Sequence, residues 1–222
     1  MAPASRQDFQ DPEGAGQRLT ALLRRNFGGF KGLVRLLLAN VDYLTGSAVK
    51  FTRPDLSQVD RLVFVCLANL MRSAFAQAVA QQAGLPAASF GLCAVSGQAP
   101  VAMVQRVAFE MGVNLDNHHS LDMPLFEPSA GDLYLVMELR HAHYLVRQGY
   151  PAERVALLGY WSRPQRLHLH DPHRKGPSYL RTCFTLIQSS VLNISRELKA
   201  AQAARHQAAE SARNAVARGT VA

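Results

Sequence analysis

Residues 61–73 read RLVFVCLANLMRS, and this stretch decides how the chain is expected to fold. Its first part contains four consecutive apolar residues, 62–65, which are typical of a strand buried on both faces. Its last part leads at Arg72 into a helical pattern that continues to Gln82 and is closed by Gly84. A buried strand followed directly by a helix is the unit from which parallel sheets are built.

The same alternation of strand and helix runs along residues 59–198. Further apolar runs predict strands at 89–95, 133–137 and 155–158, and helical spacing predicts helices at 101–111, 139–148 and about 178–199. Strands that are apolar on both faces and alternate with helices indicate an α/β fold, with a parallel sheet covered by helices on both faces. Ligands of such sheets bind at the carboxyl ends of the strands, so chemistry is expected directly after the first strand.

The composition indicates a globular protein of a reducing compartment. The three cysteines, Cys66, Cys93 and Cys183, show no paired spacing, which argues against a disulfide framework and against a zinc site. The first residues lack the apolar core of a secretory signal, and Arg35 interrupts the longest apolar stretch, so no membrane-spanning helix is expected. We therefore expect a cytoplasmic protein. Its net charge of +8 favours anionic partners such as nucleic acid, anionic lipid or phosphorylated protein.

Two segments flank the predicted α/β region. Residues 1–58 form an N-terminal extension with a polar start that is expected to be disordered, followed by basic amphipathic helices that Gly28 and Gly29 divide. Between residues 18 and 35 there are five basic residues and no acidic one. The Ala-rich basic tail, residues 199–222, either continues the last helix and frays or binds an acidic partner, and the frayed helix is the simpler interpretation.

The apolar residues of the extension line one helical face. They are Leu19, Leu22, Leu23, Phe27, Phe30, Val34, Leu37, Val41 and Leu44. Packing on the α/β region or on a second subunit is the simpler explanation of this face. The alternative is a basic amphipathic helix that lies on an anionic membrane surface, which would make the protein membrane-peripheral.

Directly after the first strand, Cys66 is followed six residues later by Arg72 and then by Ser73. A strand-to-helix loop points several backbone N–H groups at one spot, which the positive end of the helix dipole also faces. This geometry holds a phosphate dianion and favours the thiolate form of a cysteine placed inside it. Arg72 would grip two phosphate oxygens with its planar guanidinium, and Ser73 would donate a hydrogen bond to the thiolate. The predicted phosphate-binding residues are Leu67, Ala68, Asn69, Leu70, Met71 and Arg72.

A thiolate nucleophile needs an acid that protonates the leaving group and later a base that activates water. The candidate is Asp171, in the loop Leu169-His170-Asp171-Pro172-His173. Proline restricts the residue before it to extended conformations and so helps to hold the carboxylate in place. An Asp-Pro pair is also an ordinary turn signal, so the pair alone leaves the role of Asp171 open.

Taken together, residues 63–73 and the Asp171 loop resemble the signature loop and the general-acid loop of the low-molecular-weight protein tyrosine phosphatases. Further matches follow in family order from about residue 61 to residue 198: Val95-Ser96-Gly97, His118, Leu135-Val136-Met137-Glu138 and Leu157-Leu158-Gly159. The resemblance implies a four-stranded parallel sheet of flavodoxin-like type, flanked by helices on both faces. It also implies that no metal or cofactor is needed.

The resemblance assigns roles to residues of this sequence. It implies hydrolysis of phosphotyrosine or other aryl phosphates through a phosphocysteine on Cys66, with Arg72 as phosphate clamp and Asp171 as general acid. Asn69 would stabilise the unusual backbone of the loop, with His118 in its hydrogen-bond network. Relatives in bacteria often work beside a membrane tyrosine kinase, so a kinase partner and contact with an anionic membrane are further expectations.

The sequence also departs from the family pattern. Ala68 stands where Gly is usual, which is tolerable if its φ is negative. Met71 replaces a cysteine, so no protective disulfide with the nucleophile is expected, and Glu138 is one methylene longer than the usual acid. The aromatic wall has no obvious equivalent after Gly97, and residues 173–174 replace paired tyrosines with His and Arg. We therefore expect intact phosphate chemistry with altered recognition of the ring.

Two other functions compete with phosphatase activity. Arsenate reduction on the same fold needs relay thiols, but Cys93 is expected to be buried in the middle of a strand and Cys183 lies in the last helix. A non-catalytic domain that binds phosphorylated or anionic partners is favoured by the altered walls and opposed by the retained Cys66, Arg72, Ser73 and Asp171. Nucleic-acid binding is not expected, because the basic residues alternate with aliphatic residues rather than exposed aromatic ones.

Overall fold

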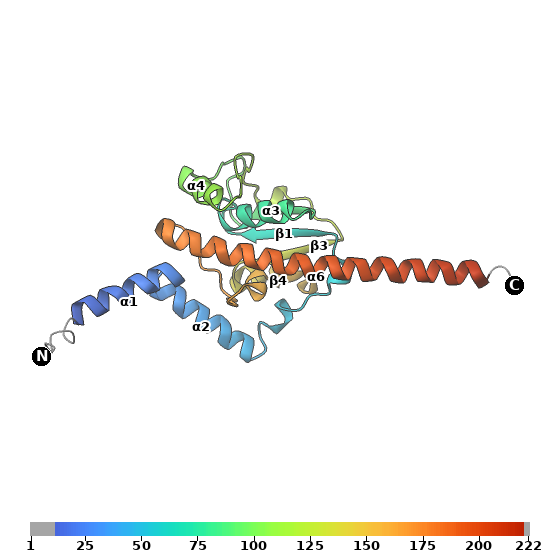
Figure 1. The fold of residues 1–222 in the computed structure, drawn as a ribbon, viewed down its shortest axis with the longest axis horizontal. Coiled ribbons are helices and arrows are strands. Elements are labelled where there is room, and N and C mark those ends of the chain that lie inside the picture. The colour runs from blue at the N-terminus through green and yellow to red at the C-terminus, as the bar shows by residue number, and fades with distance from the viewer. Residues whose placement is uncertain (1–11, 220–222) are drawn as a thin grey trace, which may run out of the picture.

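The computed structural model describes residues 12–219, and the side chains of residues 16–211 and 213. The polar start of the extension, residues 1–11, therefore lies outside the described residues. The elements follow in the order α1 (Pro12–Phe27), α2 (Phe30–Leu44), β1 (Arg61–Cys66), α3 (Arg72–Gln82), β2 (Ala87–Gly91), α4 (Ala102–Glu110), β3 (Asp132–Val136), α5 (Leu139–Arg147), β4 (Val155–Leu157) and α6 (Gly176–Gly219) (Figure 1). Short 3₁₀ helices lie at Val49–Phe51, Leu56–Gln58, Met123–Leu125, Ala152–Arg154 and Leu158–Trp161.

The four strands form one parallel sheet in the order β2-β1-β3-β4. In its register Phe64 of β1 lies between Ser89 of β2 and Leu135 of β3. Since the strands are parallel, their carboxyl ends gather at one edge, where Cys66 is the last residue of β1. The predicted fold class, a four-stranded parallel sheet with helices on both faces, is confirmed.

Alternation along the strands builds a hydrophobic core on each face of the sheet. Leu62, Phe64 and Cys66 of β1 point into the core that α3, α4 and α6 cover. Val63 and Val65 point into the core shared with α5 and with Ala39 of α2. Phe75 of α3 and Phe184 of α6 stack in the first core with ring centroids 4.0 Å apart. The long apolar runs of the sequence thus reflect strands that are buried from both sides.

The second strand is shorter than predicted. It spans Ala87–Gly91 instead of 89–95, and Cys93 is exposed in a turn rather than buried in the middle of a strand. β2 is an edge strand of the sheet, and its neighbour β1 ends at Cys66 opposite Gly91. Beyond that pair, the N–H groups of Leu92 and Cys93 bind the carbonyls of Cys66 and Leu67 while the chain turns away. The apolar pattern continues past the point where the sheet offers a partner.

The two helices of the extension are separated at Gly28 and Gly29, as predicted, but α2 contacts the body with a different face. Of the predicted face, Leu23, Phe27 and Val34 are partly buried, and the other six residues are exposed: Leu19 59%, Leu22 54%, Phe30 69%, Leu37 55%, Val41 53% and Leu44 82%. On α2 the buried residues are Gly32, Leu36 and Ala39. Two of these have little or no side chain, which allows the helix backbone to approach the body closely. Apolar spacing alone does not reveal this kind of contact.

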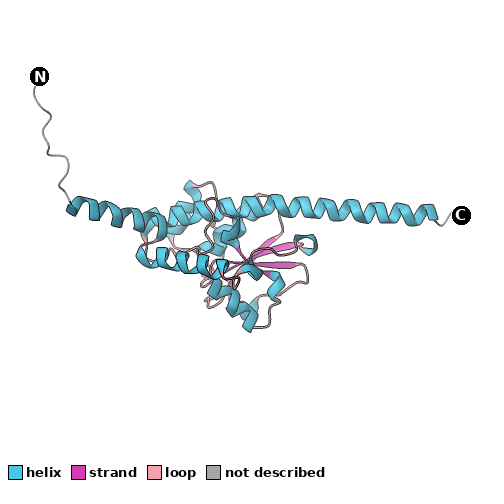
Figure 2. Ribbon diagram, turned by 90° about the horizontal axis from the view of Figure 1, so that it is seen from below, coloured by secondary structure: helices cyan, strands magenta, loops and turns pink. Residues whose placement is uncertain are grey.

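The last helix continues through the predicted tail as far as Gly219. Gln202 donates to the carbonyl of Val59 at 3.0 Å, and Arg205 pairs with Asp60 at 2.9 Å. From residue 206 the described side chains are exposed, and the helix projects from the body of the molecule (Figure 2). Within residues 12–219, no helix combines the length and the apolar character that crossing a membrane requires.

Candidate active site

The loop between β1 and α3 is shaped by Asn69, which adopts a left-handed backbone conformation with φ of 56°. Its side chain donates through Nδ2 to Ser73 Oγ at 2.9 Å and to Ser89 Oγ at 2.7 Å. Its Oδ1 accepts from the backbone N–H of Leu121 at 2.8 Å. Asparagine is among the few residues that tolerate this conformation, and these contacts fix it. Ala68, in contrast, does not have a positive φ, so alanine can take the place of the usual glycine there.

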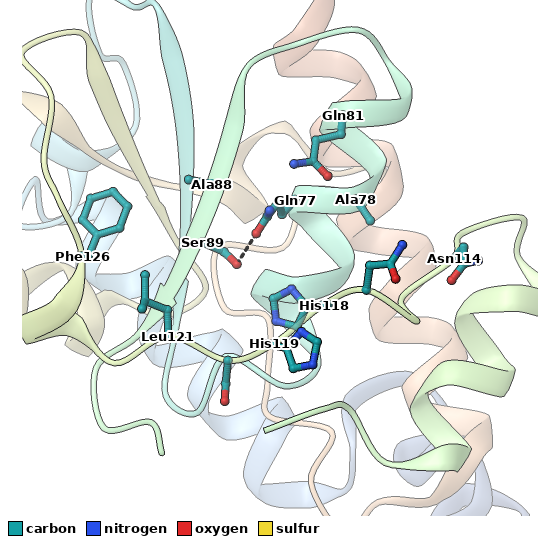
Figure 3. A pocket seen from close by; sticks show the side chains of 12 residues that line it. Gln77, Ala78, Gln81, Ala88, Ser89, Asn114, His118, His119, Leu121 and Phe126 are labelled. Carbon is teal, nitrogen blue, oxygen red and sulfur yellow. Dashed lines mark hydrogen bonds between the residues drawn. The ribbon is translucent and has the colours of Figure 1, made fainter. Parts of the chain in front are cut away.

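A second group of residues supports the loop from behind. His118 Nε2 lies 2.7 Å from the carbonyl oxygen of Asn69, and Ser89 Oγ donates to Gln77 Oε1 at 2.6 Å. These side chains border a cavity of about 730 Å³ behind the loop (Figure 3). Gly91 packs so closely that a Cβ would lie 2.8 Å from the Leu67 carbonyl oxygen. The loop is therefore held both by polar contacts and by close backbone packing.

Cys66 lies at the base of this loop with its side chain beside Ser73. The two atoms Cys66 Sγ and Ser73 Oγ are 2.9 Å apart, and both residues are buried. Because Ser73 Oγ accepts a hydrogen bond from Asn69 Nδ2, its own proton is free for the sulfur. A hydroxyl that donates to sulfur stabilises the thiolate, both as nucleophile and as leaving group.

Arg72 is fully buried and is held by two carboxylates. Its Nη1 donates to Glu138 Oε1 at 2.7 Å and to the carbonyl of Leu169 at 2.9 Å, and its Nη2 lies 3.1 Å from Asp171 Oδ2. Burial alone would lower the pKa of Arg72, but the negative partners Asp171, Cys66 and Glu138 raise it overall, so the guanidinium stays charged. Burial would raise the pKa of Glu138, yet Arg72, His141 and His168 together outweigh it and lower that pKa strongly.

Asp171 sits on the loop before α6, with its side chain 30% exposed. Its Oδ1 accepts from the backbone N–H of His173 at 3.1 Å, which orients the carboxylate. The start of this loop is tied to the sheet because the N–H of Leu169 donates to the carbonyl of Met137 at 2.9 Å. The structure thus brings Asp171 to Arg72, across about a hundred residues of sequence, and leaves the carboxylate accessible.

The sequence-predicted site residues gather at one place. Cys66, Asn69, Arg72 and Ser73 share the first loop, His118 contacts its backbone, and Asp171 reaches it from the second loop. Leu67 is 42% exposed beside Cys66 and offers apolar surface at the mouth of the loop. The residues predicted to bind phosphate, 67–72, form the connection between β1 and the first residue of α3.

Some residues of the site were given no role by the sequence. From the sequence, Glu138 is the end of a family match and one methylene longer than the usual acid, without an assigned role, although its position two residues after β3, beside the end of β1, is where a partner of Arg72 is expected. Ser89 and Gln77 complete the network of Asn69, and no motif marks them. His141 and His168 surround Glu138, at 3.8 and 3.9 Å from its carboxylate oxygens. Only the folded chain brings these residues together.

The other cysteines differ in their surroundings. Burial raises the pKa of Cys183 to about 12, so this thiol stays protonated at neutral pH. A protonated thiol is a poor nucleophile, which opposes its use as a relay in arsenate reduction. Among the described residues, no three His, Cys, Asp or Glu side chains gather in the manner of metal ligands.

Residues 61–204 match the family described as low molecular weight phosphotyrosine protein phosphatase. The match begins at β1 and includes Cys66, Arg72 and Asp171 in their order along the chain. The chain belongs to this family. As a low molecular weight phosphatase it is an enzyme that hydrolyses phosphate monoesters. The helices α1 and α2 lie outside the matched residues, so the extension is an addition to the family's domain.

Comparisons with single proteins agree with the low molecular weight phosphatase family. The chain is 29% identical over 147 residues to the low molecular weight protein-tyrosine-phosphatase Wzb of Salmonella typhi, covering 64% of this chain and 97% of Wzb. The crystal structure of the tyrosine phosphatase AmsI of Erwinia amylovora is 25% identical, with a TM-score of 0.54, over 61% of this chain and 90% of AmsI. The YwlE arginine phosphatase of Geobacillus stearothermophilus, 20% identical with a TM-score of 0.57 over 64% and 94%, shares the fold.

Proposed function

We propose that this phosphatase removes phosphate from tyrosine side chains of proteins through a phosphocysteine on Cys66. The observation that carries the proposal is the meeting of three groups at one loop. Cys66 Sγ lies 2.9 Å from the hydroxyl of Ser73. Arg72 directly precedes Ser73 in the chain, and its Nη2 lies 3.1 Å from Asp171 Oδ2. Nucleophile, phosphate clamp and acid are thus held together before a substrate arrives.

In the first step the thiolate of Cys66 attacks phosphorus and the bond to the tyrosine oxygen breaks. The backbone N–H groups of residues 67–72 and the guanidinium of Arg72 hold the phosphoryl oxygens, whose charge is spread most widely in the transition state. Asp171, in its protonated form, gives its proton to the leaving phenolate. Exposed Leu67 provides apolar surface for the departing ring.

In the second step a water molecule attacks the phosphocysteine. Asp171, now ionised, takes a proton from that water, and the phosphorus–sulfur bond breaks to release phosphate. The electron pair returns to Cys66 Sγ, where the Ser73 hydroxyl stabilises the thiolate as it leaves. Arg72 stays charged throughout, because the carboxylates around it raise its pKa.

The proposal is tested by the hydrolysis of p-nitrophenyl phosphate and of a phosphotyrosine peptide. Cys66→Ser should keep phosphate binding and lose turnover, because the loop remains but the nucleophile is gone. Asp171→Ala should slow the peptide, which has a poor leaving group, far more than the activated p-nitrophenyl ester. Unchanged turnover in Cys66→Ser would contradict the assignment. Phosphate binding without any turnover by the wild type would instead establish a non-catalytic phosphate-binding domain.

A tyrosine kinase is the partner that this chemistry implies, since the substrate must first be phosphorylated. The peptide or protein that such a kinase modifies would be the substrate of Cys66. A direct test is to incubate a tyrosine-phosphorylated kinase with the wild type and with Cys66→Ser. Loss of phosphotyrosine with the wild type alone supports this partner, and equal loss with both proteins opposes it.

We also propose that α2 rests on an anionic membrane surface. Phe30, Leu37, Val41 and Leu44 are exposed on this helix, and the basic side chains Lys31 and Arg35 are exposed near them. Apolar residues beside basic ones match the lipid boundary and its anionic headgroups. Leu37→Ser with Val41→Ser should lower cosedimentation with phosphatidylglycerol vesicles. Phosphatidylcholine vesicles should bind neither protein, and equal binding of the variant and the wild type to phosphatidylglycerol would overturn the proposal.

A further inference from the structure

A groove with three basic side chains lies between α1 and the first turn of α6. Its volume is about 900 Å³, and its polar lining consists of Gln17, Thr20, Arg24, Arg25, Lys175 and Ser178. Among the residues whose side chains the structure describes, no acidic one lines the groove, and none of the three cations has an ion pair with a carboxylate. Three like charges thus converge on one hollow from two segments about 150 residues apart in the chain.

The stability of the fold explains only part of this arrangement. Arg24 and Arg25 lie in the last turn of α1, where positive charge interacts favourably with the helix dipole. Lys175 directly precedes α6, where the same dipole disfavours positive charge. Bringing the three charges together also costs free energy through their mutual repulsion. An anion bound between them would offset that cost.

The groove is continuous with the loop that carries Asp171. The backbone N–H of Lys175 donates to the carbonyl of Pro172 at 3.0 Å. Tyr179 also lines the groove, and its hydroxyl donates to the carbonyl of His170 at 3.3 Å. Figure 1 shows α1, the start of α6 and the carboxyl end of β1 at the same end of the molecule. A peptide whose phosphotyrosine reaches Cys66 therefore has this groove beside it.

We propose that this basic groove binds acidic residues that flank the phosphorylated tyrosine in a protein substrate, an inference that rests on the proposed phosphatase function. Its concave shape suits an extended peptide segment better than a flat bilayer, and its hydroxyl and amide groups supply hydrogen bonds that a peptide uses. The exposed apolar residues Leu19 and Leu22 do not line it. The α1 side of the groove belongs to the extension and lies outside the family match, so this selection is specific to a chain that carries the extension.

The experiment compares two phosphotyrosine peptides that differ only in flanking Glu and Gln residues. For the wild type the acidic peptide should have a KM lower by about tenfold, as expected for a few solvent-exposed charge contacts. Arg24→Gln with Arg25→Gln should remove most of this preference while kcat and the hydrolysis of p-nitrophenyl phosphate stay unchanged. Lys175→Gln should remove the rest. The control is Arg147→Gln with Arg196→Gln, which removes exposed arginines from α5 and from a part of α6 that does not line the groove.

The outcomes separate a failure of the groove proposal from a failure of the phosphatase function. An equal KM for both peptides in the wild type, or an equal effect of the control pair, would overturn the proposal. Loss of binding to phosphatidylglycerol vesicles in the Arg24/Arg25 variant, with its peptide preference intact, would assign these arginines to a membrane instead. If p-nitrophenyl phosphate is not hydrolysed at all, the phosphatase function fails, and the peptide preference is then measured as direct binding by fluorescence anisotropy with Cys66→Ser.

Discussion

At the scale of single residues, the account depends on how Arg72 is held. A guanidinium that is fully buried needs partners for its charge, and here Glu138 at 2.7 Å and Asp171 at 3.1 Å supply them. The two carboxylates differ in exposure, 1% for Glu138 against 30% for Asp171. Glu138 therefore serves as a fixed anchor, whereas Asp171 is free to meet substrate and water. We regard Glu138 as a positioning residue that acts through Arg72.

Glu138→Gln should show this positioning role. Removing the charge leaves the buried guanidinium with less compensation, and we expect the free energy of unfolding to fall by about 3 kcal/mol. Because Arg72 is then less well oriented, kcat/KM for p-nitrophenyl phosphate should fall by about tenfold or more. Glu138→Asp keeps the charge and should recover part of both losses. If urea unfolding and kcat/KM are unchanged in Glu138→Gln, Glu138 does not position Arg72.

Two buried histidines beside Glu138 should make the fold sensitive to acid. Burial, with a smaller contribution from Arg72, lowers the pKa of His141 to about 3 and that of His168 to about 4, although Glu138 opposes both shifts. Neither ring nitrogen of His141 has a hydrogen-bond partner among the described residues. In the unfolded chain a histidine takes up its proton near pH ~6.5, so the unfolded state binds more protons than the folded state below that pH. The stability from these groups is complete above about pH 6.5 and is lost as the pH falls toward 4 and 3.

For these histidines we predict how steeply the free energy of unfolding changes with pH. Each should contribute about 1.4 kcal/mol of unfolding free energy per pH unit between about pH 4 and pH 6.5. Urea unfolding at several pH values measures this slope, and His141→Phe should reduce it by one histidine's share. His173→Phe, which changes an exposed histidine, is the control. A slope that His141→Phe does not alter would show that His141 is already protonated in the folded protein.

Single residues also show what a sequence can reveal of a site. Cys66, Arg72 and Ser73 were predictable because one short loop carries them at fixed spacing. Asp171 became predictable once its loop was compared with a family. Glu138 and Ser89 were not assigned roles, since their functions exist only through contacts 66 and 20 residues away along the chain. Motifs record neighbours in sequence, and these partners are neighbours only in space.

At the scale of elements, the turn between α1 and α2 links the extension to the catalytic loop. Gly28 has φ of 72°, and a Cβ there would lie 2.8 Å from His170 Cδ2 and 2.8 Å from Tyr179 Cε1. Arg166 adds a hydrogen bond of 3.0 Å to the carbonyl of Asn26 and lies over the ring of Phe27. The turn therefore packs directly against the residue before Asp171. A change in this turn is expected to reach the acid.

Gly28→Ala tests this link, with Gly84→Ala as its matched control. Both glycines follow a helix with similar φ, 72° and 75°, but nothing lies within 4 Å of a Cβ at Gly84. Each substitution should cost about 1–2 kcal/mol for the left-handed backbone. Only Gly28→Ala should also lower kcat for a phosphotyrosine peptide, because it displaces His170 and with it Asp171. Equal kcat values in the two variants would show that the extension does not touch catalysis.

Elements were predictable where local pattern and sheet pairing agree. The helix predicted at residues 72–82 is α3, because an apolar strand before it and Gly84 after it mark both ends. The second strand was predicted to run to residue 95 but ends at Gly91, since the sequence does not show where its pairing with β1 ends. The predicted face of α2 does not pack on the body, because the contact of this helix uses Gly32, Leu36 and Ala39, while packing of the predicted face on a second subunit stays a prediction.

At the scale of the whole molecule, α6 packs against the rest of the protein over only part of its length. It fills the core as far as Leu198 and makes polar contacts as far as Arg205. A chain that ends after residue 206 should therefore unfold within about 2 °C of the full chain, since a loss near 1 kcal/mol would already shift Tm by a few degrees. Thermal unfolding measures this. A chain that ends after residue 196 is the control and should be clearly destabilised, because it loses Leu198, Gln202 and Arg205. A large loss of stability in the chain that ends after residue 206 would mean that the projecting helix packs on the body.

The central claim is that phosphate passes through Cys66, and mass spectrometry of the rapidly quenched enzyme tests it most directly. The wild type is mixed with a phosphotyrosine peptide, quenched within one turnover and digested. The account predicts the mass of one phosphoryl group on the peptide that contains Cys66, and none in Cys66→Ser. A phosphoryl group on another residue, or hydrolysis that continues in Cys66→Ser, would contradict it.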